Sequence, residues 1–272
     1  LALSDNLTSF GEEHHESSDD RAGERYLLEA DQFESGAALL PHEFFHSWNG
    51  KYRRPAGLAT PIFQEPMLGD LLWVYEGLTQ YYGDILAARS GLWTPEKLRE
   101  AFAWIGAYLD QRKGRSWRDL QDTAIAAQLL YGARTEYSTW RRSVDFYDES
   151  ALIWLEADTI IRRATQGKKS LDDFCKAFHG GQSTGPRIVP YTFEDVVAAM
   201  NGVAPYDWRK FFTERLSSHG PGAPLGGLEA SGWRVAFSEE PNQHERAMES
   251  VKHTTDVRFS LRLVLTNPGG ES

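Results

Sequence analysis

Apolar residues recur at helical spacing, three or four positions apart, through most of this 272-residue chain. One helix is expected to begin after Thr94, because an N-cap threonine followed by Pro95 at the first helical position favours a helix start. The apolar residues from Leu98 to Leu109 then fall on one face. The same spacing predicts five further helices, over residues 69–88, 143–165, 170–178, 192–200 and 205–217.

The N-terminal part of the chain does not follow this spacing. Residues 11–18 are acidic and rich in histidine and serine, which favours a loop, and residues 26–30 are expected to form a short strand. Residues 49–66 contain five glycines and prolines, so we expect a loop there as well. The pattern therefore predicts a small β part before and around the first helices of a mainly helical protein.

The spacing changes again near the C-terminus. Residues 218–227 are rich in glycine and proline and predict a linker. Residues 233–237 and 257–265 alternate with period two, which predicts strands of a small β-rich element. Because the sequence ends abruptly after Asn-Pro-Gly-Gly at 267–270, we expect this element to be truncated. The chain starts at Leu1 rather than at a methionine, so we also expect an upstream segment to be missing.

Residues 42–46 read His-Glu-Phe-Phe-His on a predicted helix, which is the pattern of a zinc hydrolase. His42 and His46 are one helical turn apart, so both imidazoles can reach one ion. Glu43 is rotated by about 100° around the helix axis, where it can act as a general base on water at the metal. An amphipathic helix with two incidental histidines has the same pattern, so the motif alone leaves both interpretations open.

A catalytic zinc commonly takes three protein ligands, and two glutamates are candidates for the third. Glu65 follows His46 by nineteen positions, a familiar separation, but it lies next to Pro66 in a segment whose prolines prevent a rigid helix. Glu76 follows by thirty positions, inside a strongly apolar predicted helix where a carboxylate is costly unless it is paired or bound to a metal. We predict Glu76 as the ligand; an ion pair between Glu76 and Arg53 or Arg54 is the alternative.

Three runs together carry a family resemblance: HEFFHSWN at 42–49, KYRRP at 51–55 and LLWVYEGLTQYYGD at 71–84. They resemble the glycyl aminopeptidase family of gluzincin zinc metallopeptidases, relatives of aminopeptidase N that usually carry a PDZ domain. The resemblance extends from about residue 11 to residue 233. It implies a longer insert between the second histidine and the glutamate than in aminopeptidase N, which favours Glu76 over Glu65.

The resemblance also implies a fold class and a domain organisation. We expect a mainly α protein with a small β part, in which a thermolysin-like (gluzincin) catalytic domain over residues 1–217 has short β segments followed by a helical bundle. A linker is expected over 218–230. A partial PDZ-like β element, truncated at its end, is expected over 231–272.

Further site residues are implied by the same resemblance. Tyr147 falls where related aminopeptidases place the tyrosine that stabilises the oxyanion, although Glu149 and Ser150 replace the usual Lys-Gly. The family run Gly-Gly-Leu-Glu-His is similar to residues 10–14. It assigns substrate binding to three residues: Gly11 at a close backbone approach, Glu13 at the substrate's amino group, and His14. The alternatives are a tyrosine that only packs and a solvated acidic loop.

The composition limits the classes of partner that the protein is expected to bind. The net charge of −10 argues against a nucleic-acid or anionic-membrane surface, and no apolar run approaches the ~18 residues that a membrane span needs. The expectation is a soluble protein, cytoplasmic or periplasmic. The single cysteine, Cys175, is expected to be a small buried apolar residue rather than a ligand.

The sequence hypothesis is a zinc-dependent aminopeptidase that holds one zinc ion per chain between His42, His46 and Glu76 and cleaves the N-terminal bond of peptides. Glu43 and Tyr147 are its expected catalytic residues. The family resemblance implies small N-terminal residues, Gly or Ala, in the substrate. A zinc endopeptidase with the same core and a non-catalytic peptide-binding module remain as alternatives.

Overall fold

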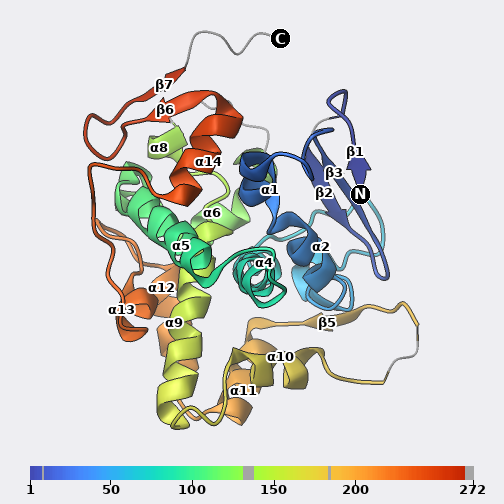
Figure 1. Ribbon diagram of the computed structural model, residues 1–272. Helices are drawn as coiled ribbons and strands as arrows, with labels where there is room; N and C mark the ends of the chain where they lie inside the picture. Colours follow the sequence, from blue (N-terminus) through green and yellow to red (C-terminus); the bar gives the residue numbers. More distant parts are fainter. Residues whose placement is uncertain (8, 131–137, 183–184, 267–272) are drawn as a thin grey trace.

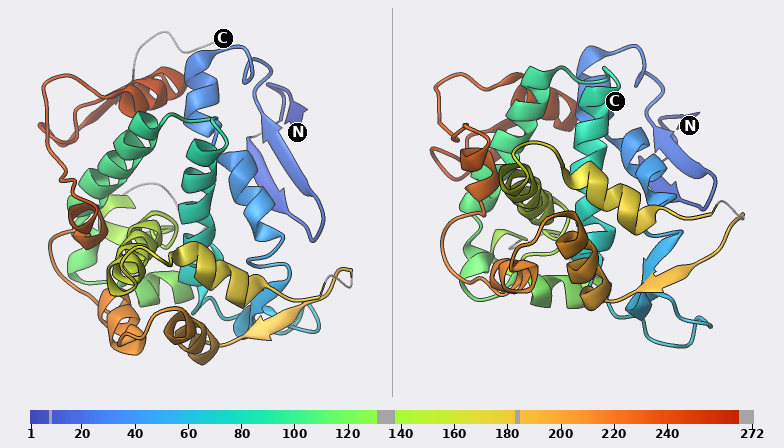
Figure 2. Two further views of the ribbon diagram at one scale, coloured as in Figure 1. Left: turned by 60° about the horizontal axis from the view of Figure 1, so that its bottom comes forward. Right: turned by 90° about the horizontal axis from the view of Figure 1, so that it is seen from below.

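The computed structural model describes residues 1–7, 9–130, 138–182 and 185–266 (Figure 1). Over these residues the protein is mainly helical, with small sheets, as predicted. Helix α4 (Gly77–Arg89) lies at the centre and packs against α2 (Leu39–His46) on one side and α9 (Asp148–Ala164) on the other. The two views of Figure 2 place the N-terminal sheet on the outer side of α2, away from α9.

The N-terminal sheet consists of β1 (Ala2–Leu3), β3 (Ser18–Ala22) and β2 (Phe10–Glu13), in that order. β2 runs antiparallel to β3 and parallel β1 lies on the far side of β3, so β2 is an edge strand. The predicted loop over 11–18 is therefore correct only for residues 14–17, because residues 11–13 belong to β2 and Ser18 begins β3. The sequence does not predict strand β2, because its half-buried positions carry glycine and glutamate instead of apolar residues and so show no apolar alternation.

The predicted strand over 26–30 is also wrong. The chain turns there, with Tyr26 N donating to Gly23 O at 3.0 Å, and helix α1 (Ala30–Gly36) follows. Tyr26 is buried by packing of its ring against Phe33 of this helix, at 5.6 Å between ring centroids. Tyr26 is therefore buried by a contact with a helix and not by membership of a strand.

The predicted helix over 69–88 is present but interrupted. It consists of α3 (Leu72–Tyr75) and α4, with Glu76 between them. Backbone hydrogen bonds still span the junction, because Glu76 N donates to Leu72 O at 2.8 Å and Gln80 N donates to Glu76 O at 2.7 Å. Glu76 is consequently held in a near-helical backbone at a fixed position.

The remaining helices largely follow the predicted spacing. Thr94, Ser170 and Thr192 each cap a helix with the side-chain oxygen. The helix predicted from 143 begins at Asp148. The helices are α5 (Pro95–Asp110), η2 (Lys113–Ser116), α6 (Leu120–Ile125), α7 (Ala127–Leu130), α8 (Ser138–Arg141), α10 (Leu171–His179), α11 (Phe193–Val203) and α12 (Trp208–Leu216).

Aromatic side chains fill the core between these helices. The Trp73 and Trp154 rings stack at 5.5 Å, and Trp154 Nε1 donates to Trp73 O at 3.0 Å, which fixes α9 against α3. Phe212 of α12 packs against both rings. Burial of three large aromatic side chains at one point is worth several kcal/mol. The core therefore fixes the position of α3, which precedes Glu76, relative to α9, which follows Tyr147.

The segment over 49–66 is mostly irregular, as predicted, with two short regular pieces. β4 (Arg53–Pro55) pairs in parallel with β5 (Val189–Tyr191), and the 3-10 helix η1 (Ala56–Leu58) follows β4. This small sheet joins the segment after α2 to the segment after α10.

The C-terminal region differs from the prediction. Residues 233–237 form no strand, and helix α14 (Gln243–Lys252) lies where a β-rich element was expected. The other elements there are α13 (Gly226–Ala230), β6 (Thr254–Asp256) and β7 (Val264–Thr266). α14 packs against α1 and α5. A PDZ-like element is not recognisable in the described residues up to 266, and the boundaries at 217 and 230 stay predictions.

Candidate metal centre

Three side chains from two helices converge beside the junction of α3 and α4. His42 Nε2 and His46 Nε2 lie 3.1 Å apart, and Glu76 Oε2 lies 3.6 Å from the first and 3.2 Å from the second. Four-coordinate zinc binds these atom types at about 2.0–2.2 Å, so tetrahedral ligands lie about 3.3 Å from one another. The observed separations match that geometry.

Hydrogen bonding in the site also fits a metal. Glu76 Oε2 is buried, and within the described residues no hydrogen bond reaches it. A buried carboxylate oxygen without a hydrogen bond costs free energy unless a cation compensates it. The donor set of two imidazole nitrogens and one carboxylate oxygen is one that zinc accepts.

The protonation of the three groups suits ligation. Burial raises the pKa of Glu76, but the imidazoles of His42 and His46 have a larger, opposite effect. The resulting pKa is about 2, so the carboxylate is charged. Burial lowers the pKa of His42, which favours the neutral ring that binds metals. Burial also lowers the pKa of His46, but the adjacent Glu76 carboxylate outweighs it and the net shift is upward. A metal ion would take the place of that proton.

Asn49 connects the two ligand-bearing helices, a role that the sequence pattern does not predict. His46 Nδ1 lies 2.8 Å from Asn49 O, which orients the ring so that Nε2 faces the other ligands. Asn49 Nδ2 donates to Val74 O at 2.8 Å and to Thr79 Oγ1 at 2.9 Å, on either side of Glu76. Its fully buried side chain thereby fixes the end of α2 against α3 and α4.

Glycines allow the close packing of these helices. A Cβ on Gly83 would lie 3.1 Å from the Cβ of His42, so α4 approaches the ligand helix closely at this point. A Cβ on Gly77 would lie 2.1 Å from the Cβ of Ser150, so α4 approaches α9 just as closely. Both glycines follow Glu76 on the same helix. They bring the metal ligands and the start of α9 together.

Glu43 lies beside the three converging side chains and points toward the N-terminal sheet. Its carboxylate, that of Glu13 and a ring nitrogen of His46 lie within 4.8 Å of one another. Burial raises the pKa of Glu43 to about 7, and Oε2 is buried with no hydrogen bond from the described residues. A carboxylate with a pKa in this range is suited to accept and return a proton near neutral pH.

Gly11 of β2 is the backbone neighbour of Glu43. A Cβ added to Gly11 would lie 2.2 Å from Glu43 Oε1 and 2.8 Å from Leu39 Cδ1. Gly11 thus packs closely against the side chain of Glu43, and its role in substrate binding stays a prediction. Any larger residue here has to displace that carboxylate.

This contact leads to a prediction for Gly11→Ala. The methyl group should push the Glu43 carboxylate aside and lower kcat for peptide hydrolysis about 10²-fold, because displacement of a reacting group by about 1 Å has that effect. Zinc content should not change. Gly202→Ala is the matched control, because a Cβ there meets nothing within 4 Å. Unchanged kcat in Gly11→Ala would contradict the role given to this contact.

Glu13, two residues along the same strand, lies over the ligand helix. It accepts a hydrogen bond from Tyr75 Oη, and Lys51 Nζ lies 3.4 Å from its Oε1. Burial raises the pKa of Glu13, but the charge on His46, the Tyr75 hydroxyl and Lys51 lower it below its ordinary value. A charged, half-buried carboxylate therefore faces the site from the edge strand. His14, by contrast, is exposed at the end of β2, and its backbone N donates to Ser17 O.

Tyr147 lies next to His42, at the N-cap of α9. Its ring stacks on His42 at 6.0 Å between centroids. Glu149 and Ser150 stand where related aminopeptidases have Lys-Gly. Glu149 is buried and forms ion pairs with Arg115 and Arg142. Arg142 also donates to Asp145 at 2.8 Å. The charge of the buried Glu149 carboxylate is thus compensated by an ion-pair network two residues from Tyr147.

Residues 35–153 match a family model described as M61 glycyl aminopeptidase. Just under half of the chain, including all three candidate ligands, is therefore similar to the glycyl aminopeptidase family. The match contains the two histidines, Glu43, Glu76 and Tyr147, whereas Gly11 and Glu13 lie outside it. This similarity supports a peptidase function for the matched region.

A solved structure shares the fold of this chain. It is described as an aminopeptidase N family protein from Idiomarina loihiensis, with a TM-score of 0.71 and 21% sequence identity. The similarity covers 82% of this chain and 38% of the Idiomarina chain, so this sequence spans well under half the length of that protein. No curated protein matches the chain.

The structure separates the other candidate residues from the ligands. Glu65 is exposed in the segment after α2. Arg53 lies over the ring of Phe178, 4.4 Å from its centroid, and Arg54 Nε donates to Gly50 O at 2.9 Å, so neither forms the alternative ion pair with Glu76. Cys175 lies half-buried against the helical core, and burial raises its pKa to about 12.

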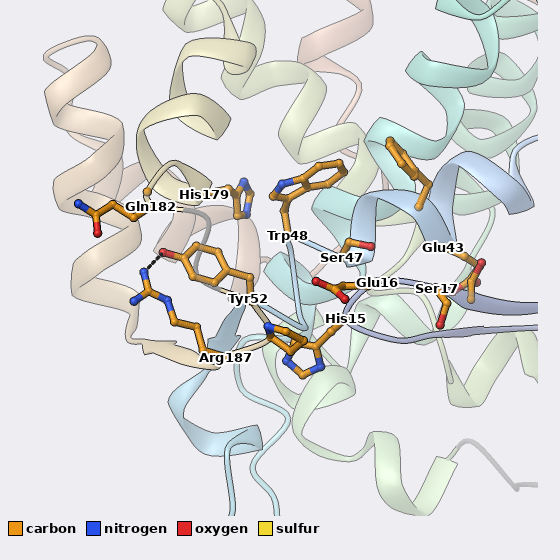
Figure 3. Close-up of a pocket in the computed structure, with 15 residues that line it drawn as sticks. His15, Glu16, Ser17, Glu43, Ser47, Trp48, Tyr52, His179, Gln182 and Arg187 are labelled. Atoms are coloured by element: carbon orange, nitrogen blue, oxygen red, sulfur yellow. Dashed lines mark hydrogen bonds between the residues drawn. The ribbon is translucent and has the colours of Figure 1, made fainter.

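A cleft of about 460 Å³ begins at Glu43 and runs between the β2–β3 turn, the end of α2 and the segment after α10 (Figure 3). Phe44 and Trp48 form an apolar lip, with ring centroids 5.0 Å apart. Both side chains are strongly exposed, at 60% and 41%. No helix of the described residues is both long and apolar enough to cross a membrane.

Proposed function

We propose that this chain is a zinc-dependent aminopeptidase that hydrolyses the N-terminal bond of peptides. The observation that carries the proposal is the convergence of His42, His46 and Glu76 at separations suited to one tetrahedral ion, with Glu43 adjacent. When bound, zinc supplies Lewis-acid polarisation of the peptide carbonyl and lowers the pKa of water into the neutral range. One ion per chain is expected.

The chain's own residues would divide the remaining work. Glu43 takes a proton from the attacking water and returns it to the leaving amine, for which a pKa of about 7 is suitable. Tyr147, next to His42, donates a hydrogen bond to the oxyanion that develops on the substrate. Glu13 binds the substrate's ammonium group by a charge-assisted hydrogen bond.

The edge strand β2 supports this orientation of the substrate. Among the described strands, β2 pairs with β3 alone, so the backbone groups of its other edge are available to an extended peptide. Glu13 lies on the same strand as Gly11, close to Glu43. A peptide aligned with β2 would therefore place its amino terminus at Glu13 and its first peptide bond near Glu43.

Replacement of Glu13 by Gln tests the aminopeptidase assignment. Loss of the charge should lower kcat/KM for free-amine peptides roughly tenfold to a hundredfold, because hydrogen bonds to charged groups contribute about 1.5–3 kcal/mol. Cleavage of N-acetylated peptides should change little. The matched control is Glu12→Gln, whose side chain is exposed on the other face of β2. An equal loss on both substrate classes would exclude the amine-binding role.

Two other functions remain distinguishable by the same assay. A zinc endopeptidase would cleave N-acetylated peptides as well as free ones. A peptide-binding module would bind peptides without cleaving them, but the buried carboxylate of Glu43 beside three converging ligands favours catalysis. The preference for N-terminal Gly or Ala is implied by the similarity to the glycyl aminopeptidase family and is part of the proposal.

A further inference from the structure

The carboxylate of Glu13 is held by the protein through one of its two oxygens. Tyr75 Oη donates a hydrogen bond to Oε1, and Lys51 Nζ lies 3.4 Å from the same atom. No other side chain in the described part of the chain forms a hydrogen bond or an ion pair with this carboxylate. The Glu13 side chain is 19% exposed, so a ligand can reach the second oxygen, Oε2.

Tyr75 is fixed by its surroundings. Its side chain is buried, and its ring lies 5.0 Å from the ring of His46 between centroids. On another side the ring lies against Gly50, where an added Cβ would be 2.5 Å from Tyr75 Cζ. Gly50 has a φ of +122°, which favours glycine, so the backbone can approach the ring this closely. The Tyr75 hydroxyl therefore has a defined position beside the metal ligands.

Lys51 reaches Glu13 from the segment after α2. Its backbone N donates to His46 O at 3.0 Å, which ties this residue to the end of the ligand helix. The side chain is 20% exposed, and Glu13 is the carboxylate with which it pairs among the described residues. The ammonium group of Lys51 thus compensates a half-buried carboxylate and directs it at the same time.

The two contacts have a consequence for ligand binding. A glutamate side chain loses conformational freedom when it binds a ligand, and a side chain that is already ordered has less to lose. The Glu13 carboxylate, the Glu43 carboxylate and a ring nitrogen of His46 lie within 4.8 Å of one another. An oxygen of Glu13 that is fixed in this position can accept a hydrogen bond from an ammonium group next to the bond that is cleaved.

We propose that Tyr75 and Lys51 are positioning residues for recognition of the substrate's amino terminus. They hold Oε1 of Glu13, so that Oε2 binds the ammonium group. The preference for peptides with a free amine then depends on two residues that act only through Glu13. This inference rests on the proposed aminopeptidase function and on the role given there to Glu13.

Calorimetric binding to the zinc-loaded Glu43→Gln chain tests this inference without turnover. The probes are Gly-Ala-Ala and N-acetyl-Gly-Ala-Ala, and the ratio of their affinities measures recognition of the amine. Adding Tyr75→Phe or Lys51→Met should each lower this ratio by about three- to tenfold, the effect of losing one hydrogen bond. Affinity for the acetylated peptide and the zinc content should stay unchanged. If Tyr75→Phe loses zinc, Lys51→Met decides the result.

Two further variants separate positioning from packing. Tyr26→Phe is the matched control for Tyr75→Phe, because Tyr26 is also buried and its Oη has no hydrogen bond within the described residues. It should leave the affinity ratio unchanged. Lys51→Arg keeps a cation beside Glu13 and should retain most of the ratio that Lys51→Met loses.

An unchanged ratio in Tyr75→Phe and Lys51→Met would overturn the inference, as would an equal loss of affinity for both peptides. If Glu13→Gln alone removes the ratio, the amine-binding role of Glu13 stands and the inference fails. Absence of any preference in the Glu43→Gln chain would overturn both. A chain with the expected ratios that hydrolyses no peptide would keep this inference and lose the peptidase assignment.

Discussion

Replacement of Glu76 by Gln is expected to weaken zinc binding about a hundredfold or more and to abolish peptide hydrolysis at ordinary zinc concentrations. Zinc binding at protein sites contributes ~10–16 kcal/mol, and an equal share among four ligands is about 3 kcal/mol or more for each. The neutral amide of glutamine also leaves the cation without the buried carboxylate that neutralises it. Competition with a fluorescent zinc chelator measures the change in Kd.

Glu65→Gln is the control for this prediction. Glu65 lies nearer to His46 in the sequence, but its side chain is exposed and away from the histidines. Its replacement should leave zinc affinity and kcat unchanged. A loss of zinc from Glu65→Gln together with retention in Glu76→Gln would reverse the assignment of the third ligand.

Glu43→Gln has the second large expected effect, and it should separate metal binding from catalysis. Glutamine keeps the shape of Glu43 but cannot accept a proton, so kcat should fall by about 10²–10⁴-fold. His42, His46 and Glu76 are untouched, so about one zinc per chain should remain bound. The two readouts are metal analysis of the dialysed protein and release of N-terminal amino acids from peptides.

The Glu76 and Glu43 variants are informative as a pair. If both lose zinc, Glu43 contributes to the ligand shell, and the alternative set of Glu13, Glu43 and His46 gains support. If Glu43→Gln retains full activity, the proton-transfer role is excluded. The expected combination is loss of zinc in the first variant and loss of activity alone in the second.

The proximity of Glu76 to the histidines could be predicted from the sequence because the evidence for it is local. A carboxylate in the apolar run from Leu71 to Leu78 needs a partner, and prolines around Glu65 prevent a rigid helix. Helix caps were equally local, and Thr94, Ser170 and Thr192 all cap as their sequence context indicates.

Features that depend on distant contacts could not be predicted. The half-buried positions of β2 are Gly11 and Glu13, which face Glu43 and Tyr75, so the strand shows no apolar alternation. Asn49 acts through hydrogen bonds to residues about 25 to 30 positions away. Helix α14 is mostly polar and buries only His244 and Ala247, so its sequence offers few apolar residues from which to predict a packed helix. In each case tertiary contacts, and not the local pattern, determine the structure.

The most direct test of the candidate metal centre is zinc-edge anomalous diffraction from crystals of the zinc-soaked Glu43→Gln protein. The structure predicts one strong peak per chain, about 2.0–2.2 Å from His42 Nε2, His46 Nε2 and a carboxylate oxygen of Glu76. Absence of a peak at these three residues, or a peak bound by Glu13 and His46 without Glu76, would contradict the proposed centre.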